Sequence, residues 1–371
     1  MASDLSRDER ATLEGGVLPA DVMHEILLRV PAKALCRLRL VCRSWRSLTS
    51  DPRFAREHLP RHPLFAARHA LWVQTHVVNM SGDIVKQIRS FEDLIFFDLS
   101  MQPDLICAAE TASGRNKRAC LLNPATGEIN ALPDGSMGAA QSTCILGHIP
   151  STGEYKVLRI GGVIDPVQPC EVITLGGGDR KWRERSDPPI HVLTGFTFVA
   201  VVGGVAYFLA DYYYYAADDT KQDSIASFDL VTEEWRPTAL QGPVSTNPVE
   251  TKKVVYDPHT SYPQLAKLNG CLVMAFHSYQ HCSLDLWFLI DVDRCIWNRG
   301  HSIRCPPSWG LRAQYPLVVS DDGKVVVWLK CSQVLKAYDP RIGTWADLAA
   351  LENYSFFGML EGSLLCSGLQ N

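Results

Sequence analysis

The chain has 371 residues, of which 46% are hydrophobic and 20% charged, and its formal net charge is -4 at pH 7. This composition predicts a soluble protein that is large enough for more than one domain. The weakly acidic balance excludes a whole-molecule attraction to nucleic acid or anionic lipid, so such binding would need a local basic patch.

The N-terminal sixteen residues, MASDLSRDERATLEGG, are polar and lack the apolar core of a signal peptide, so we expect residues 1–16 to form a disordered tail. The chain contains 12 cysteines but no C-x-x-C pair, which argues against a zinc knuckle. Cysteines scattered through apolar segments are typical of reduced core residues. They favour a cytoplasmic or nuclear location.

A helical pattern extends from Leu18 to about Leu59. The first predicted helix lies between Pro19 and Pro31, and its apolar face consists of Val22, Ile26, Leu27 and Val30. A second is predicted over residues 32–41, with Leu35, Leu38 and Val41 on one face. A third carries Trp45 and Leu48 and ends at Asp51-Pro52. Three short helices cannot bury all these side chains, so some must face a partner.

Basic residues are frequent in the same stretch: Lys33, Arg37, Arg39, Arg43 and Arg46. A helix-turn-helix could place such residues on phosphates. However, Pro31 interrupts the helices, and few Asn, Gln or Ser side chains are available to read bases. We therefore interpret these residues as a solvated helix face and predict no nucleic-acid partner.

Beyond Leu64 short apolar runs alternate with turn residues. Three segments resemble two strands joined by a tight glycine turn: VVGGVAYFLA, KLNGCLVMAFH and SDDGKVVVWLK. The first ends an uncharged stretch from Pro188 to Ala210, which is long enough to cross a membrane. Its β-branched and aromatic residues and the pair Gly203-Gly204 favour a buried hairpin instead, so no membrane contact is predicted.

A turn-and-anchor repeat indicates the architecture. In five copies a turn residue is followed six positions later by a large apolar anchor: Asn123 and Ile129, Gly176 and Trp182, Asp229 and Trp235, Asp291 and Trp297, Asp339 and Trp345. Successive copies begin 53, 53, 62 and 48 residues apart, and the segment around Trp72 is a candidate sixth copy. A period of about 50 residues is typical of a kelch-like β-propeller. We expect about six blades with the tryptophans packed between them, and NYSFFGMLEGSLLCSGL is a candidate for the closing strand.

The N-terminal stretch matches the defining positions of one known motif in order: Leu18-Pro19, Ile26-Leu27, Pro31, Leu35, Val41-Cys42-Arg43, Trp45 and Ser50 to Phe54. Residues 17–60 thus strongly resemble the F-box in its plant form. Residues 64–371 resemble the F-box-associated propeller of plant F-box proteins, through LLNPATGEINALP and GEYKVLRI. The predicted fold is multidomain, with an α-helical F-box of three helices followed by an all-β propeller of about six kelch-like blades.

The resemblance implies a substrate-recognition subunit of a Skp–cullin–F-box ubiquitin ligase. The F-box would bind a Skp-type adaptor and through it a cullin and a RING subunit, while the propeller would bind an unknown protein substrate. A propeller interaction protein that binds the adaptor without ligase activity is the alternative. We expect the adaptor contacts to be Leu18, Pro19, Ile26, Leu27, Pro31 and Leu35, with Val41 and Trp45 shared between core and interface.

Four consecutive tyrosines, Tyr212, Tyr213, Tyr214 and Tyr215, precede an acidic run. Strand alternation cannot bury all four, so they are candidate substrate contacts on a loop, although a loop that packs on its own blade would have the same sequence.

Catalysis has no motif in this chain, because it lacks Gly-x-Ser-x-Gly, His-Glu-x-x-His, a phosphate loop and a dinucleotide fingerprint. A propeller enzyme is therefore the most distant alternative, and no cofactor is predicted. His277, His281 and Cys282 would have metal-ligand spacing only on a helix, whereas a strand is predicted there, so no metal site is expected.

Overall fold

The computed structural model describes residues 19–69, 75–88, 95–102, 105–111, 117–124, 126–137, 142–161, 167–176, 180–195, 197–211, 223–246, 263–278, 282–306 and 314–360. The predicted disordered tail lies outside these residues, and so does Leu18. None of the described helices is long and apolar enough to cross a membrane.

The described chain begins with four helices that form a helical domain: α2 (Ala20–Leu28), α3 (Ala32–Leu38), α4 (Arg43–Thr49) and α5 (Pro52–Arg61). The prediction of a second helix up to residue 41 was wrong. The amides of Leu40 and Val41 bond to carbonyls three residues back instead of four, which ends the helix in a tight turn. The three-helix prediction also missed α5, because Pro52 ends α4 but is itself compatible with the first turn of a helix.

Helix α5 is held against the end of α2 by two histidines. Nε2 of His58 bonds to the carbonyl of Val30 at 2.8 Å, and Nε2 of His62 bonds to the carbonyl of Leu28 at 3.1 Å. Leu28 is the last residue of α2, so His62 caps the end of this helix, and His58 binds the turn that follows it. Burial lowers the pKa of His58, in keeping with a neutral donor at this position.

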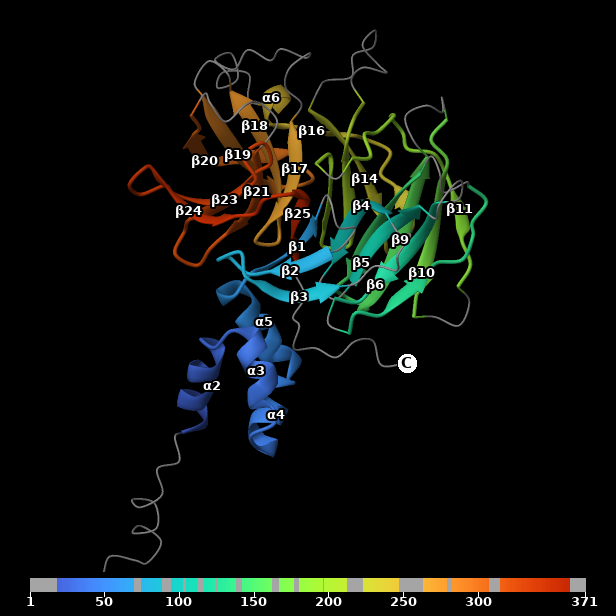
Figure 1. The fold of residues 1–371 in the computed structure, drawn as a ribbon. Coiled ribbons are helices and arrows are strands. Elements are labelled where there is room, and N and C mark those ends of the chain that lie inside the picture. The colour runs from blue at the N-terminus through green and yellow to red at the C-terminus, as the bar shows by residue number, and fades with distance from the viewer. Residues whose placement is uncertain are drawn as a thin grey trace, which may run out of the picture.

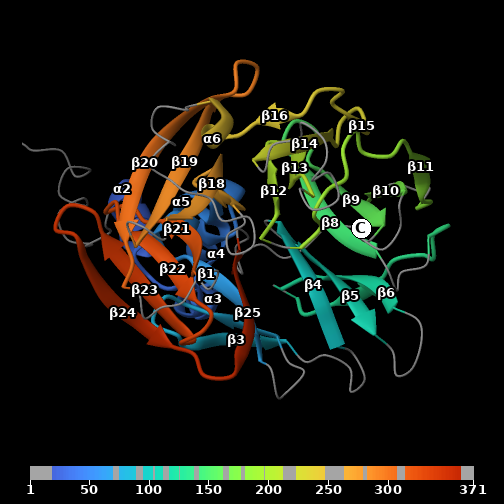
Figure 2. The same ribbon diagram turned by 90° about the horizontal axis from the view of Figure 1, so that it is seen from above.

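The described strands form six antiparallel sheets, which are arranged as the blades of a ring (Figure 2). From the inner strand outward, blade 1 consists of β25 (Tyr354–Leu360), β1 (Leu64–His69), β2 (Thr75–Val78) and β3 (Ile84–Ile88). Blade 2 consists of β4 (Ile95–Gln102), β5 (Leu105–Thr111), β6 (Lys117–Leu122) and β7 (Ile129–Ala131). Blade 3 consists of β8 (Ser142–Ile149), β9 (Glu154–Gly161), β10 (Cys170–Leu175) and β11 (Arg183–Arg185).

The remaining blades follow the same order. Blade 4 consists of β12 (Val199–Val202), β13 (Val205–Leu209), β14 (Ser224–Asp229) and β15 (Glu234–Trp235), and β16 (Leu240–Gln241) also pairs with β14. Blade 5 consists of β17 (Gln264–Leu268), β18 (Cys271–Ser278), β19 (Ser283–Asp291) and β20 (Ile296–Arg304). Blade 6 consists of β21 (Gln314–Val319), β22 (Val325–Leu329), β23 (Val334–Asp339) and β24 (Thr344–Ala350). A short helix, α6 (Pro243–Thr246), follows blade 4.

The ring is closed by pairing of the two ends of the propeller sequence. Strand β25, from the candidate closing segment, pairs antiparallel with β1, and Leu64 lies opposite Leu360. The sequence prediction for the closing strand is therefore confirmed. The first blade combines strands about 290 positions apart, so neither end can leave without opening the ring.

The predicted hairpins and repeats are also confirmed. Strands β12 and β13 form a hairpin across Gly203-Gly204, as predicted for this uncharged stretch in place of a membrane span. The sixth repeat copy is the β2–β3 hairpin, in which Asn79 accepts hydrogen bonds from the amides of Ser81 and Asp83. Val85, six positions after Asn79, packs in the same cluster as Ile129.

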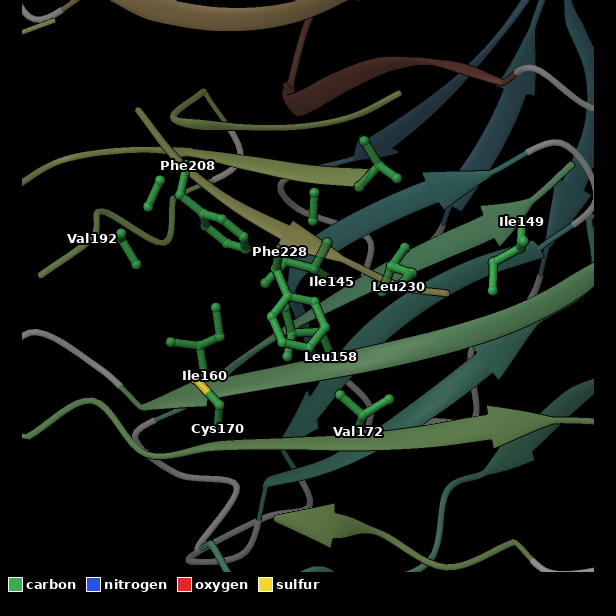
Figure 3. Packing of buried hydrophobic residues seen from close by; sticks show 13 residues of the cluster. Ile145, Ile149, Leu158, Ile160, Cys170, Val172, Val192, Phe208, Phe228 and Leu230 are labelled. Atoms are coloured by element: carbon green, nitrogen blue, oxygen red, sulfur yellow. The ribbon is translucent and has the colours of Figure 1, made fainter. Parts of the chain in front are cut away.

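The tryptophans of the repeat connect neighbouring blades, as predicted. In each case the indole Nε1 donates to a backbone carbonyl near the outer margin of the preceding blade: Trp182 to Pro133 (2.7 Å), Trp235 to Ser186 (3.0 Å), Trp297 to Gln241 (2.9 Å) and Trp345 to Arg304 (2.8 Å). Nearer the axis, apolar residues fill the space between blades. Figure 3 shows this for blades 3 and 4, where Leu158 and Val172 face Phe208 and Phe228.

The two faces of the ring carry different connections. Because each blade has antiparallel strands in chain order, all six inner strands run in one direction. Short hairpin turns, such as Gly203-Gly204 and Asn269-Gly270, lie where the inner strands end, and the described residues that flank the longer connections, such as Asp211 and Asp223, lie at the opposite ends of the strands. Helix α5 leads into β1 at the turn side, so the helical domain lies on the face opposite the longer connections (Figure 1).

Candidate functional site

The helical domain has a small core. Leu27, Leu28, Leu35 and Phe54 are buried, and Met23, Val30, Leu38, Trp45 and Leu48 pack around them in partly buried positions. The α2 face predicted from periodicity was only partly right, because Leu27 points into this core whereas Val22 and Ile26 point outward.

Several apolar side chains of this domain lie outside the core and are exposed. They are Val22 (43% exposed), Ile26 (44%), Leu40 (79%) and Val41 (63%), and Pro19 and Pro31 are exposed as well. We call these six residues the aliphatic surface. Water contacts this much aliphatic side chain only at a cost in free energy, which is typical of a surface that binds a partner.

The predicted contact residues divide into two sets in the structure. Pro19, Ile26, Pro31 and Val41 lie at the surface, whereas Leu27 and Leu35 are buried in the core and Trp45 is partly buried. Val22 and Leu40 were not among the predicted contacts. Leu40 lies just beyond the end of α3, and the expectation that the helix continues to Val41 gave no signal for its exposure.

One of the arginines interpreted as a solvated face has an internal role. Arg39 donates from Nη2 to the carbonyl of Thr49 at 2.6 Å and from Nε to its hydroxyl at 3.2 Å. It therefore ties the end of α3 to the end of α4. Arg37 of α3 and Arg43 and Arg46 of α4 are exposed, and Arg46 also donates to the carbonyl of Arg39 at 3.3 Å.

Family comparison connects these two parts of the molecule. The F-box domain matches residues 17–57, and the F-box associated beta propeller domain matches residues 64–339, which is most of the chain. This chain belongs to the F-box proteins that carry an F-box-associated β-propeller. The helical domain is accordingly the F-box, and the six-bladed ring is the associated propeller.

Relatives of this F-box protein occur in Arabidopsis thaliana. A putative F-box protein is 26% identical over 55% of this chain and 56% of its own length, so that alignment spans little more than half of the relative. An F-box/LRR-repeat protein is 23% identical over 87% of this chain and 76% of its own length. A putative F-box/kelch-repeat protein is 27% identical over 63% of each. F-box proteins of this architecture are substrate adaptors of Skp–cullin–F-box complexes, and their F-box generally binds Skp-type adaptors.

The predicted substrate contacts Tyr212 to Tyr215 lie outside the described residues, but the residues that flank them are well anchored. Asp211 is buried, its amide donates to the carbonyl of His191 at 2.8 Å, and its Oδ2 lies 3.8 Å from Nδ1 of His191. Asp223 is also buried and accepts from the amide of Ser245 at 2.9 Å and from its hydroxyl. The tyrosine segment therefore joins two fixed points on the longer-connection face.

No metal site is found among the described residues of the F-box protein, where no group of three or more His, Cys, Asp or Glu could hold an ion. His277 belongs to strand β18 and not to a helix, and burial lowers its pKa to about 4. His281 lies outside the described residues.

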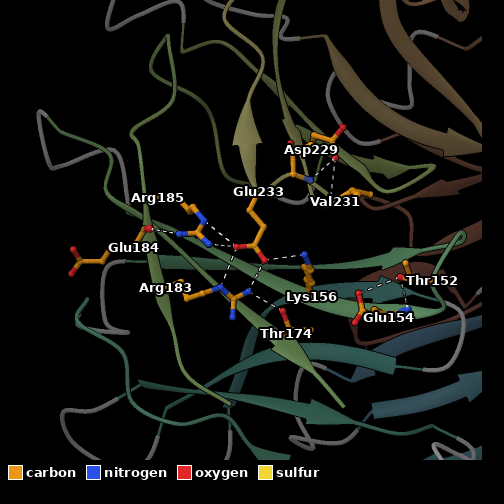
Figure 4. A network of polar contacts seen from close by, with 11 residues as sticks. Thr152, Glu154, Lys156, Thr174, Arg183, Glu184, Arg185, Asp229, Val231 and Glu233 are labelled. Atoms are coloured by element: carbon orange, nitrogen blue, oxygen red, sulfur yellow. Dashed lines mark hydrogen bonds and ion pairs between the residues drawn. The ribbon is translucent and has the colours of Figure 1, made fainter. Parts of the chain in front are cut away.

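The propeller contains one charged cluster that sequence patterns did not indicate. We call it the Glu233 cluster; it consists of Lys156, Arg183, Arg185, Thr174 and Glu233 (Figure 4). Glu233 projects from the β14–β15 turn of blade 4 and pairs with Lys156 Nζ at 2.8 Å, Arg183 Nη2 at 2.5 Å and Arg185, all of blade 3. Although burial alone would raise it, hydrogen bonds from the three cations hold the pKa of Glu233 at about 2. The cluster therefore joins two blades as an ion-pair network.

Proposed function

We propose that this chain is the substrate-recognition subunit of a Skp–cullin–F-box E3 ubiquitin ligase. Its F-box binds a Skp-type adaptor, which links it to a cullin and a RING subunit, and its propeller binds a protein substrate for ubiquitination. The chain itself supplies no catalytic group, because the ubiquitin chemistry belongs to the other subunits. We also propose that it works in the cytoplasm or nucleus.

The observation that carries this proposal is the aliphatic surface of the F-box. Four of its side chains are 43% to 79% exposed although the domain has a core of its own beneath them. Exposed apolar side chains and exposed arginines in the same domain match the composition of protein interfaces, which combine apolar and polar groups. The buried residues Leu27 and Leu35 would support this surface from below, and Pro19, Ile26, Pro31 and Val41 would touch the adaptor.

The position of the propeller supports the same proposal. The F-box lies on the turn side, so the longer-connection face, with the anchored ends of the tyrosine segment, points away from the adaptor. We propose that the substrate binds on that face and that Tyr212 to Tyr215 contribute to its capture. Loss of capture on combined Tyr-to-Ala substitution is the expected result, and unchanged capture would remove these tyrosines from the proposal.

Co-purification of the full chain with a plant Skp-type adaptor tests the first step. The double variant Ile26→Asp/Val41→Asp should lose at least nine-tenths of the adaptor captured by the wild type, because carboxylates would be buried without partners at the interface. Val231→Asp is the matched control, since Val231 is 54% exposed but lies on a propeller turn. Failure of the wild type to capture the adaptor, or full capture by the double variant, would contradict the proposal.

Reconstitution with cullin, RING subunit and conjugating enzyme separates the ligase from its alternative. A ligase subunit should support adaptor-dependent ubiquitination of itself or of a captured protein, and the double variant should not. Stable adaptor binding without any ubiquitin transfer would instead identify an interaction protein that uses the F-box only for docking.

A further inference from the structure

The turn between α3 and α4 carries the most exposed large apolar side chains among the described residues of the F-box. It extends from Arg39 to Cys42 and contains Leu40, which is 79% exposed, and Val41, which is 63% exposed. Cys42 is exposed as well. Side chains that point into water do not fix a turn by their own packing. The position of this turn relative to α4 therefore depends on other contacts.

Two backbone bonds shape the first part of the turn. The amide of Leu40 donates to the carbonyl of Arg37 at 3.0 Å, and the amide of Val41 donates to the carbonyl of Leu38 at 3.0 Å. Both acceptors belong to α3. These bonds bend the chain out of the helix, but they do not hold α4 against it.

Arg39 makes contacts that do reach α4. Its Nη2 donates to the carbonyl of Thr49 at 2.6 Å, and its Nε donates to the Thr49 hydroxyl at 3.2 Å. Its own carbonyl accepts from Nε of Arg46 at 3.3 Å. Thr49 is fully buried, and its hydroxyl donates to the carbonyl of Trp45 at 2.8 Å, so this acceptor is held in place. The residue before Leu40 is thus fixed to α4 through its side chain and its backbone.

The geometry of this contact suits an arginine. Thr49 is the last residue of α4, so its carbonyl has no partner within the helix and needs a donor where it is buried. The planar guanidinium carries its N–H groups at a fixed spacing and can serve the carbonyl and the hydroxyl together. A lysine keeps the charge but ends in a single nitrogen, so it cannot reproduce this pair of donors.

We propose that Arg39 is a positioning residue for adaptor docking, which holds Leu40 and Val41 in the arrangement that the adaptor binds. This inference rests on the function proposed above, and Arg39 acts through the turn and not through a contact of its own with the adaptor. Apolar side chains that are already in place lose little conformational freedom on binding, which raises the affinity. If the turn can take other positions, only the competent fraction binds, and the apparent affinity falls with that fraction.

Support of the F-box fold alone is the alternative role for Arg39. The buried core consists of Leu27, Leu28, Leu35 and Phe54, which belong to α2, α3 and α5. Arg39 is not a member of this cluster and joins α3 to α4. Loss of its contact should therefore loosen the turn while the core keeps the domain folded. The kinetics of adaptor binding separate the two roles.

The test compares Arg39→Lys with the matched control Arg37→Lys in the full chain, with a purified plant Skp-type adaptor as the binding partner. Arg37 is exposed on α3, so both variants keep the charge and only Arg39→Lys changes the contact with α4. In biolayer interferometry, Arg39→Lys should associate about 10-fold more slowly than the wild type and dissociate at nearly the same rate. Arg37→Lys should stay within about 2-fold of the wild type.

Two further measurements locate the effect. Circular dichroism at the assay temperature gives the folded fraction of each variant, so that rates refer to folded chain. Hydrogen exchange of Arg39→Lys should be faster at the amides of residues 40–42 and unchanged in α2 and α5, because the core is intact.

Thr49→Val and Thr49→Ser form a second matched pair on the acceptor side. Valine has the shape of threonine without the hydroxyl, whereas serine keeps the hydroxyl that accepts from Arg39. Thr49→Val should associate with the adaptor about 5-fold more slowly, and Thr49→Ser should behave like the wild type. This pair decides the question if Arg39→Lys does not fold.

A folded Arg39→Lys chain that associates at the wild-type rate would overturn the proposal, and so would a loss of binding that only follows the unfolded fraction. Either result, together with adaptor capture by the wild type, removes the positioning role and leaves the proposed function intact. A wild-type chain that does not bind the adaptor would contradict both.

Discussion

The F-box and the propeller bury their apolar residues in opposite ways. The F-box buries four large side chains and leaves Leu40 and Val41 mostly in water. In the propeller, each pair of neighbouring blades encloses its own cluster, and exposed aliphatic residues such as Val231 and Ile342 lie on turns at its margin.

This difference shows which part of the molecule is complete by itself. A closed ring of blades satisfies its own sheet faces and is stabilised by every interblade contact, so its stability is internal. The F-box is below the size at which a core is comfortably stable, and its exposed surface is available for binding energy. Substitutions should therefore affect stability mainly in the propeller and partner binding mainly in the F-box.

The largest effect is expected from opening the ring. Deleting residues 354–371 removes β25, leaves one edge of β1 without its hydrogen-bonded partner and leaves blade 1 without its inner strand. We expect loss of the cooperative thermal transition of the propeller, measured by circular dichroism. A chain that ends after Leu360 keeps β25 and is the control; equal melting of both chains would show that closure does not hold the ring.

The next largest effect on the stability of the propeller is expected at the Glu233 cluster. Glu233→Gln removes the carboxylate and leaves Lys156, Arg183 and Arg185 close together without a counter-charge. Breaking a buried ion pair on one side costs about 3 kcal/mol, which denaturant unfolding should detect. Glu234→Gln is the control, because Glu234 is exposed next to it. Adaptor capture should be the same in both variants.

The same cluster predicts an acid dependence. The pKa of Glu233 is lowered from 4.5 to about 2 in the folded chain, so its stabilisation is complete above about pH 4.5 and is lost as the pH falls toward 2. Unfolding free energies measured between pH 5 and 3 should fall more steeply for the wild type than for Glu233→Gln. Parallel pH profiles would contradict the assignment.

In the F-box, a core substitution should act locally. Leu35 is fully buried, and Leu35→Ala should lower the stability of this domain by about 3 kcal/mol through the cavity it leaves. Hydrogen exchange should become faster in α2 to α5 while the propeller strands remain unchanged. Faster exchange throughout the chain would show that the two regions unfold as one unit and would break the comparison.

The smallest effects are expected at the repeated tryptophans. Trp297→Phe keeps most of the ring but removes the hydrogen bond to the carbonyl of Gln241, and Trp345→Phe does the same for that of Arg304. Each change should cost about 1 kcal/mol in propeller unfolding. The loss of unfolding free energy should be greater at Trp297, which is only 5% exposed, than at the half-buried Trp345. An equal loss would indicate that the bond to the preceding blade matters more than ring burial.

Local sequence predicted the features that depend on local rules. Glycine turns at 203–204 and 269–270 set hairpins, Asp and Asn set the repeated turns through amide-to-side-chain bonds, and the period of the repeat indicated six blades. The prediction of helix ends in the F-box was wrong at two places for the same reason. Whether the chain stays helical after Leu38 or restarts at Pro52 depends on contacts with other helices, among them Arg39 with Thr49 and His58 with Val30.

By itself, the sequence determined the order of the blades and the interblade tryptophans, because turn chemistry and alternation act over a few residues, and it offered a candidate for the strand that closes the ring. Only the tertiary structure decided which apolar residues of the F-box are left at the surface and that Glu233 meets Lys156 across 77 positions. These features arise from packing between distant segments, and burial and pairing of that kind leave no period or motif in the chain.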